Sequence, residues 1–227
     1  RVRREIHDRL KAMAEAHDLS LFVTMLSAYA LFLHRLTGQA ELAVGVPCAG
    51  QIKSGRPQLL GSDVRVMPVQ SRLETGDCFV SFARRIAERF YAAYEHQWIA
   101  EAGLPRATRT PAATPLLPAI FNFDPGMKPD VFRFPRVEAS YVYQSRDAEL
   151  VELSLNAVIE GDELVLECAY NRDLFDSERM HARLAKLEAL LAEVAGAPQK
   201  ALQELEVPAT NDRALSEGSP FFFGPTA

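Results

Sequence analysis

Five histidines are the side chains of this 227-residue sequence best suited to acid–base or metal chemistry: His7, His17, His34, His96 and His181. None stands two to four residues from another histidine or a cysteine, so no local metal-ligand motif is present. The HExxH and GxSxG signatures are absent as well. We expect His7 and His181 on polar helix faces. His34 falls in a last helical turn, where a protonated imidazole would favour the helix dipole.

His96 has two interpretations. It lies near the predicted end of a helix, with Tyr94, Gln97 and Trp98 around it. Its ring either packs under Trp98 or lies at a cleft, where it would orient a loop. Because most single histidines are structural, the residue type by itself favours packing.

The segment from Gly50 to Pro57 has the glycine spacing of a P-loop. A P-loop needs a lysine and a hydroxyl residue after its last glycine, to bind phosphate and magnesium. Arg56 and Pro57 occupy those positions, and the proline disfavours a helix at Arg56. We therefore predict a surface loop here and no nucleotide site.

Net charge, cysteine spacing and the apolar stretches of the sequence argue against several classes of protein. The net charge of −5 argues against a nucleic-acid binder, which usually carries a basic stripe. Cys48, Cys78 and Cys168 lack the spacing of a zinc site or a disulfide framework, so we expect a reducing cytoplasm. The apolar stretch 19–36 is interrupted by polar residues, which predicts a buried helix and no membrane span. The start at Arg1, without a signal peptide, indicates a fragment or a processed chain.

Hydrophobic periodicity predicts both helices and strands. The helices cover 2–17, 20–36 with Ser20 as N-cap and Gly38 at the end, the segment after Asp77, and the segment from Asp176 to Gly196. The strands cover 42–46, 64–68, 116–123, 137–143 and a hairpin of 151–159 with 164–170. Pro68 places its strand at an edge or a bulge. This order predicts an α/β sandwich, a single lobe whose mixed β-sheet has helices packed on one face.

Proline-rich stretches at 102–118 and 125–135 are predicted to be irregular, as is the tail after Pro198. The tail carries Phe221, Phe222 and Phe223 in a row. Three exposed phenylalanines would be unusual, so we expect them to dock on a groove or a partner, or to pack on their own domain.

Five segments, in order and at similar spacing, resemble the C-terminal half of a condensation domain from a nonribosomal peptide synthetase. This family lies within the chloramphenicol acetyltransferase-like superfamily. The first segment is 33–47 with Ala49-Gly50, which contains the helix end, the Thr-Gly turn and a strand. The other four are Gly61 to Pro68, His96-Gln97, 106–116, and 170–176 with the sequence Tyr-Asn-Arg-Asp-Leu-Phe-Asp. The family has Gly-x-Phe-Val-Asn-Thr-x-Pro at the second segment and His-Gln-Asp at the third.

Two of these segments depart from the family pattern. Asp63 stands where the family has phenylalanine, Arg65 where it has asparagine, and Val66 where it has threonine. Trp-Ile-Ala-Glu follows His96-Gln97 in place of Asp-Val-Pro-Phe. Both segments line the cleft between the lobes in the family. Their departures therefore imply an unusual acyl acceptor, or a lobe kept for docking.

The resemblance implies a C-terminal lobe at 1–196 and an irregular tail or linker at 197–227. In the family, two lobes form a tunnel in which an acceptor amine attacks a donor thioester, without metal or nucleotide. Carrier proteins deliver both substrates on phosphopantetheine arms. The sequence lacks the family's His-His-x-x-x-Asp-Gly motif, so we expect no catalytic residue here and no activity from this chain alone. The substrate-binding residues carried over are Gly61, Asp63, Arg65, Pro68, His96 and Gln97, and Arg65 is expected to bias substrate charge.

The partners implied are the N-terminal lobe and peptidyl or acyl carrier proteins, in cytoplasmic secondary metabolism such as antibiotic biosynthesis. The two proline-rich stretches are candidates for arms that reach the other lobe. A lobe without its partner exposes an apolar face, so self-association would be unsurprising. Two alternatives stay open. One is a non-catalytic platform that recruits a carrier protein or a tailoring enzyme, and the other is an epimerisation or acyltransferase lobe.

Overall fold

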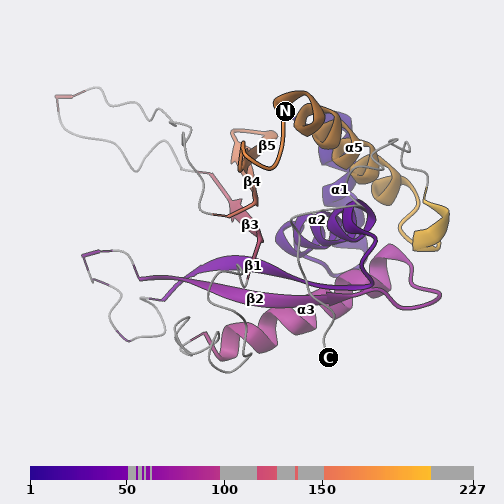
Figure 1. Ribbon diagram of the computed structural model, residues 1–227, viewed down its shortest axis with the longest axis horizontal. Helices are drawn as coiled ribbons and strands as arrows, with labels where there is room; N and C mark the ends of the chain where they lie inside the picture. The colour runs from indigo at the N-terminus through magenta and orange to yellow at the C-terminus, as the bar shows by residue number, and fades with distance from the viewer. Residues whose placement is uncertain are drawn as a thin grey trace.

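The computed structural model describes residues 1–50, 55, 58, 60–61, 63–97, 117–126, 136–137 and 151–205. Their helices are α1 (Arg4–Ala16), α2 (Leu21–Thr37), α3 (Phe79–Glu95), α5 (Ser177–Gly196) and the 3-10 helix η3 (Leu202–Glu204) (Figure 1). Their strands are β1 (Glu41–Ala49), β2 (Val64–Arg72), β3 (Ala119–Asp124), β4 (Leu153–Glu160) and β5 (Glu163–Tyr170). The predicted strand 137–143, apart from Val137, and residues 221–223 lie outside the described residues, as does most of the two proline-rich stretches.

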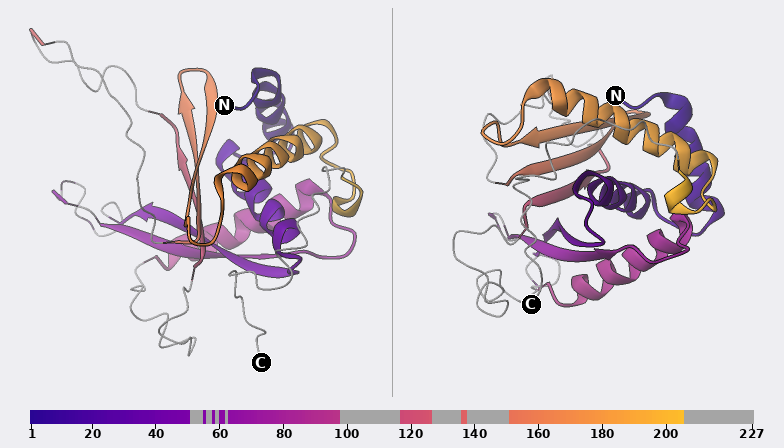
Figure 2. Two further views of the ribbon diagram at one scale, coloured as in Figure 1. Left: turned by 45° about the horizontal axis from the view of Figure 1, so that its top comes forward. Right: turned by 45° about the vertical axis from the view of Figure 1, so that its right-hand side comes forward.

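The described strands form one mixed sheet in the order β2-β1-β3-β4-β5. The outer pairs are antiparallel, whereas β1 pairs with β3, and β3 with β4, in parallel. Figure 2 shows that the sheet is strongly twisted, with β1 and β2 running across the direction of β3 to β5. Pro68 lies in β2, an edge strand of this sheet, opposite Gly45 of β1. The predicted α/β fold and the predicted edge position of Pro68 are therefore confirmed.

Helix α2 forms the centre of the core. Every residue from Val23 to His34 is buried, and the helix packs against α1, α3, α5 and the sheet (Figure 2). It begins where the Ser20 hydroxyl accepts a hydrogen bond of 3.1 Å from the Val23 N–H. It ends at Gly38, whose φ of 71° is the left-handed conformation that glycine adopts without strain. Both predicted helix boundaries are correct, and the all-round burial explains the nearly continuous apolar sequence.

Two predictions about histidines are wrong. His7 is fully buried, and its Nδ1 lies 3.1 Å from the carbonyl oxygen of Asp162 in the β4–β5 turn. His34 is also buried, and burial lowers the pKa of its imidazole, so the neutral form is favoured over the protonated one. The sequence pattern of α1 placed His7 on a polar helix face and gave no indication that this face packs against the β4–β5 hairpin. His181 is exposed, as predicted.

Within the described residues, no single helix is long and apolar enough to cross a membrane. The pair α1 and α2 passes on combined length and composition, but its two helices are bent by 109° at the break between them.

Candidate functional site

The end of β1, the start of β2 and the end of α3 meet at a corner of the fold. The Gly50 N–H donates a hydrogen bond of 2.7 Å to the carbonyl oxygen of Asp63. The Arg65 side chain reaches from β2 to the carbonyl oxygen of Gln97, which follows α3, at 3.4 Å. We call Gly50, Asp63, Arg65 and Gln97 the polar corner. Three sequence segments that are far apart in the chain thus come together here.

Asp63 and Arg65 form an ion pair within the polar corner. The Nε of Arg65 lies 3.3 Å from Oδ1 of Asp63, and the two side chains are 36% and 22% exposed. These two residues replace a phenylalanine and an asparagine of the resembled family, and each supplies the charge that neutralises the other. The positive charge of Arg65 is therefore balanced by Asp63. The hydrogen bond from Arg65 to the Gln97 carbonyl also links the end of α3 to β2.

Gly50 makes this close approach feasible. A Cβ atom at Gly50 would lie 2.7 Å from Oδ2 of Asp63 and 2.8 Å from its carbonyl oxygen. Real side chains do not tolerate contacts that short, and one of the two atoms belongs to the backbone. The glycine is therefore required by the position of Asp63.

Gln97 contributes a buried carboxamide to the polar corner. Its residue is 5% exposed, and neither Oε1 nor Nε2 has a hydrogen-bond partner in the structure of the described residues. A buried amide without partners lowers stability, and such a group is usually explained by function or by a missing neighbour. Gln97 thus offers one donor group and one acceptor to an incoming polar group.

The other predicted site residues lie outside the polar corner. His96 is exposed and ends α3, where its N–H donates a hydrogen bond of 3.0 Å to the Ala93 carbonyl. Gly61 is exposed, and Pro68 lies farther along β2. The proposed packing of His96 under Trp98 involves a residue outside the described ones. The structure therefore joins Asp63, Arg65 and Gln97 through hydrogen bonds and an ion pair, whereas His96 is exposed at the end of α3 and Pro68 lies in the middle of β2.

The chemistry open to this site is binding and orientation. The described residues contain no group of three or more His, Cys, Asp or Glu that could hold a metal ion. Burial raises the pKa of Cys48 to about 11 and that of Cys168 to about 12, so both thiols stay protonated and weakly nucleophilic. The carboxylate of Asp63 is engaged by Arg65.

Glu152 is a buried carboxylic acid that the sequence analysis missed. It precedes β4, is 8% exposed, and burial raises its pKa to about 7. Its Oε2 has no hydrogen-bond partner in the described structure. The alternating pattern of the hairpin predicted Val151 and Leu153 to face the core. Leu153 is buried and Val151 is partly buried, but the pattern gave no indication that the acid between them is buried.

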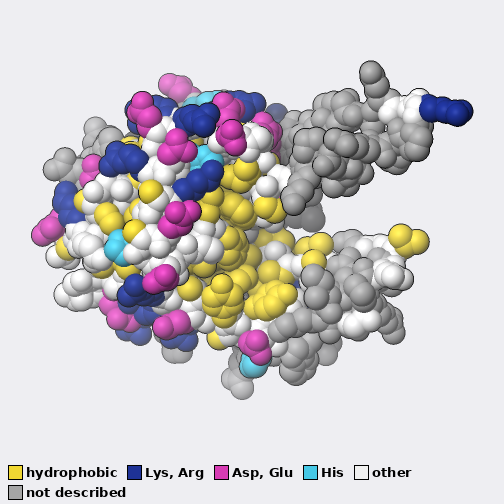
Figure 3. Space-filling view, turned by 180° about the vertical axis from the view of Figure 1, so that it is seen from behind, with side chains coloured by type: hydrophobic (Ala, Val, Ile, Leu, Met, Phe, Trp, Pro, Cys, Tyr) yellow, Lys and Arg dark blue, Asp and Glu magenta, His cyan; other side chains and the backbone are white. Residues whose placement is uncertain are grey.

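Aromatic side chains gather at the same end of α3. Phe90 lies 4.8 Å from Phe22 of α2 and 6.0 Å from Tyr94, measured between ring centroids. Phe22 also lies 6.2 Å from Phe123 at the end of β3, and Tyr91 is 58% exposed. We call these five residues the aromatic cluster. Figure 3 shows apolar side chains collected in the middle of one face of the molecule.

Comparison with known proteins adds a family to this geometry. Residues 1–215 match the protein-family model described as Condensation domain. Surfactin synthase subunit 1 of Bacillus subtilis (strain 168) is 26% identical over 237 aligned positions, which cover 97% of this chain and 6% of that protein. The chain thus spans a small part of the curated relative that it matches.

Solved structures confirm the fold. A four-domain nonribosomal peptide synthetase bound to AMP and glycine matches with a TM-score of 0.81 at 21% identity, over 95% of this chain and 18% of that one. The first condensation domain of the calcium-dependent antibiotic synthetase, in complex with a substrate analogue, gives 0.70 at 15% identity, over 92% and 46%. The X-domain in its complex with OxyB from teicoplanin biosynthesis gives 0.75 at 19% identity, over 92% and 47%.

Proposed function

Because the chain belongs to the condensation-domain family, we propose that it is the C-terminal lobe of an amide-forming enzyme of nonribosomal peptide synthesis. In the proposed reaction, the nitrogen of an acceptor amine attacks the carbonyl carbon of a carrier-bound acyl or aminoacyl thioester. A C–N bond forms, the C–S bond breaks, the thiol stays on the phosphopantetheine arm, and the amine loses a proton. The three free cysteines fit a cytoplasmic setting.

The polar corner is the observation that carries this proposal. Three of the five family-like segments supply its residues, and they meet although up to 47 residues separate Gly50 from Gln97. Motifs that matched by chance would have no reason to converge. Under the proposal the corner forms part of one tunnel wall, and the partly exposed Arg65 guanidinium faces substrate there.

The other half of the enzyme has to come from an N-terminal lobe. The chain covers 46% of a solved condensation-domain chain, which leaves room for a second lobe of similar size. The aromatic cluster, with Tyr91 exposed, is the surface we assign to that contact, since exposed aromatic surface favours protein interfaces. The base that assists the amine would belong to that lobe, so this chain is inactive alone.

A complementation assay tests the proposal. The 227-residue chain, the N-terminal half of its parent domain, and both together are given two carrier proteins loaded with donor and acceptor. We expect amide product from the combined halves and none from either half. Amide formation at a normal rate by this chain alone would refute the assignment, as would no product from an intact parent domain with a complete histidine motif.

Arg65 gives a second test, of its proposed influence on substrate charge. In the intact domain, Arg65→Asn restores the family residue and should change the preference between acidic and neutral donors. Arg72→Asn, at the other end of β2, is the matched control and should leave that preference unchanged. An unchanged preference in both variants would remove Arg65 from the substrate-binding set.

A non-catalytic platform is the second candidate function. Two observations favour it: the altered residues at Asp63, Arg65 and after Gln97, and the likeness to an X-domain solved in complex with OxyB. A titration calorimetry experiment with carrier proteins and tailoring enzymes from the same gene cluster would separate the two. Binding without amide formation by the intact domain favours the platform, whereas the absence of any protein partner counts against it. An epimerisation lobe would show racemised carrier-bound substrate.

A further inference from the structure

Strands β3, β4 and β5 have a face that points away from the described helices. Leu153, Leu155 and Ala157 of β4 are buried in the core. Ser154 and Asn156 alternate with them and are partly exposed, because successive side chains of a strand point to opposite faces. Figures 1 and 2 show the described helices on the core side of these strands. We call the other side, which carries Asn156, the outer face.

Three polar side chains form a hydrogen-bonded row across the outer face. Asn122 of β3 is the register partner of Asn156, and Asn156 is that of Glu167 in β5. Nδ2 of Asn122 donates to Oδ1 of Asn156 at 2.9 Å, and Nδ2 of Asn156 donates to Oε2 of Glu167 at 3.1 Å. Because a carboxylate accepts and does not donate, Glu167 sets the orientation of both amides. It is also the charged end of the row.

The three strands carry acidic residues and no Lys, Arg or His. Their acids are Asp124, Glu160, Glu163 and Glu167. Arg1 neutralises Glu160 and Glu163 at the hairpin turn through two ion pairs. Within the described residues, no ion pair involves Asp124 or Glu167. The outer face therefore has negative charge that the described chain does not compensate.

A buried acid without a partner lies on the same face of β4. The carbonyl oxygen of Glu152 accepts a hydrogen bond of 3.0 Å from the Asn171 N–H, so strand pairing extends to this residue. Its spacing of four from Asn156 places both side chains on one face. Glu152 is 8% exposed, and its Oε2 has no hydrogen-bond partner in the described structure. A cation bound at this face would relieve the loss of stability that an unpaired buried carboxyl causes.

The spacing of these groups fits an organic cation better than a metal ion. Metal sites in proteins bring several ligand atoms to about 2.0–2.6 Å from one point. The described residues contain no group of three His, Cys, Asp or Glu arranged in this way. An ammonium or a guanidinium instead has three to five N–H donors, which can be shared among separate acceptors.

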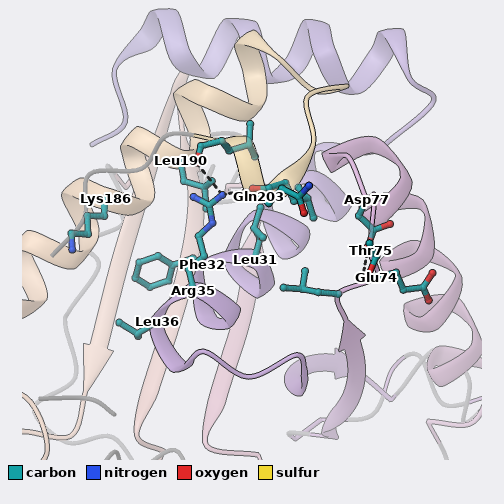
Figure 4. A pocket seen from close by; sticks show the side chains of 13 residues that line it. Leu31, Phe32, Arg35, Leu36, Glu74, Thr75, Asp77, Lys186, Leu190 and Gln203 are labelled. Carbon is teal, nitrogen blue, oxygen red and sulfur yellow. Dashed lines mark hydrogen bonds between the residues drawn. The ribbon is translucent and has the colours of Figure 1, made fainter. Parts of the chain in front are cut away.

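A hollow of about 630 Å³ between α2, α5 and η3 has no such preference for one sign of charge. Figure 4 shows the basic Arg35 and Lys186 beside it together with the acidic Glu74 and Asp77. Because both signs of charge are present, a cation gains less there than on the outer face.

We propose that the outer face of β3–β5 binds the basic side chain of a carrier-bound substrate, an ammonium or a guanidinium group. The Glu167 carboxylate supplies the charge, and Asn156 holds that carboxylate in place. The identity of the cation as part of a substrate rests on the proposed function, whereas the charge preference of the face does not.

Binding of two small probes to the 227-residue chain tests the charge preference without amide formation. Lysine amide and norleucine amide differ by one ammonium group. Titrations followed by the side-chain amide NMR signals of Asn122 and Asn156 should give a dissociation constant about threefold to fivefold lower for lysine amide. Glu167→Gln keeps an oxygen for Asn156 and should abolish the difference. Glu163→Gln is the matched control and should preserve it, because Arg1 already neutralises that carboxylate.

A second variant guards against misfolding of Glu167→Gln. Val165 is partly exposed and lies two residues before Glu167 on the same face. Val165→Lys therefore supplies an internal ammonium and should abolish the preference while the carboxylate stays. Equal dissociation constants for the two probes in the parent chain would overturn the proposal. So would a preference that neither variant changes, or one that Glu163→Gln reduces as much, since net charge would then be its source.

The intact parent domain tests the assignment to a substrate. Lysine and norleucine are loaded on the donor carrier in one arm and on the acceptor carrier in the other. We expect kcat/KM to favour lysine in one arm, and Glu167→Gln to remove that preference. No preference in either arm, from a domain that forms amides, would overturn the assignment. A domain that forms no amide would contradict the proposed function instead, and the probe titration would still decide whether the cation site exists.

Discussion

The Nε2 atom of His34 lies 2.8 Å from the hydroxyl oxygen of Ser71, which joins the end of α2 to β2. The other ring nitrogen, Nδ1, lies 2.7 Å from the carbonyl oxygen of Gln39. A carbonyl accepts, so Nδ1 carries the proton and Nε2 accepts from the serine hydroxyl. A neutral imidazole therefore connects the central helix to the strand that carries Arg65.

This connection predicts acid sensitivity. Burial lowers the pKa of His34 in the folded chain below the 6.5 of the unfolded chain, so the unfolded state binds more protons. The contribution of His34 to stability is then complete above pH 6.5 and is lost as the pH drops below it. Urea unfolding between pH 5 and 8 measures this, and His34→Gln should flatten the profile. His7 shifts in the same direction, so His7→Gln is needed to apportion the effect.

Ser71→Ala tests the same contact at constant pH. It removes the donor and leaves the buried Nε2 of His34 without a partner, which costs about 1–3 kcal/mol of unfolding free energy at pH 8. Ser177→Ala, at an exposed serine in the first turn of α5, should cost less. Equal losses for the two serines would contradict the role assigned to His34.

Glu152 predicts the opposite pH dependence. Its folded pKa of about 7 lies above the ordinary 4.5, because burial disfavours the carboxylate. Between those values the unfolded state loses its proton first, so the contribution of Glu152 to stability falls as the pH rises from 4.5 to about 7, by about 3 kcal/mol. Glu152→Gln should remove this slope, whereas the exposed Glu15→Gln should leave it. A slope unchanged in Glu152→Gln would show that the buried acid is not its source.

The elements were predictable where local signals and burial agree. Ser20, Gly38 and Asp176 fix helix ends through short-range hydrogen bonds, which sequence reveals directly. The β4–β5 hairpin follows from strict alternation around Gly161. These features depend on residues a few positions apart, and the chain needs no tertiary information to specify them.

The site was predictable in part. Asp63 and Arg65 stand two residues apart. Side chains at that spacing lie on the same face of an extended chain, so their ion pair is predictable from the sequence. The bond from Arg65 to the Gln97 carbonyl depends on where α3 ends against β2, which no local pattern encodes. The burial of His7 and Glu152 is likewise set by packing between distant elements.

Gly50→Ala predicts a steric conflict in the polar corner. The new Cβ would meet both the carboxylate and the backbone carbonyl of Asp63, and overpacking of this kind costs about 1–3 kcal/mol. Asp63→Ala in the same chain should restore part of that loss, since the backbone contact remains. Gly196→Ala is the matched control, because its Cβ would meet the flexible end of Arg9. Full rescue by Asp63→Ala would place the conflict in the side chain alone.

A double-mutant cycle on Asp63 and Arg65 measures whether the two departures compensate each other. The pair is partly exposed, so we expect a coupling free energy of about 0.5–1 kcal/mol between Asp63→Asn and Arg65→Met at low salt, declining as salt is added. The Arg3–Glu188 pair, with Arg3 69% exposed, is the control and should couple more weakly.

The same cycle separates charge from positioning in an intact condensation domain. Asp63→Asn releases the guanidinium from its carboxylate and should increase the preference for acidic donors, whereas Arg65→Met should remove it. If Arg65 acts by holding the end of α3 near Gln97, both variants should instead raise KM for neutral and acidic donors alike. Kinetics with a matched pair of donors that differ by one carboxylate distinguish the two roles, because a positioning effect does not depend on substrate charge.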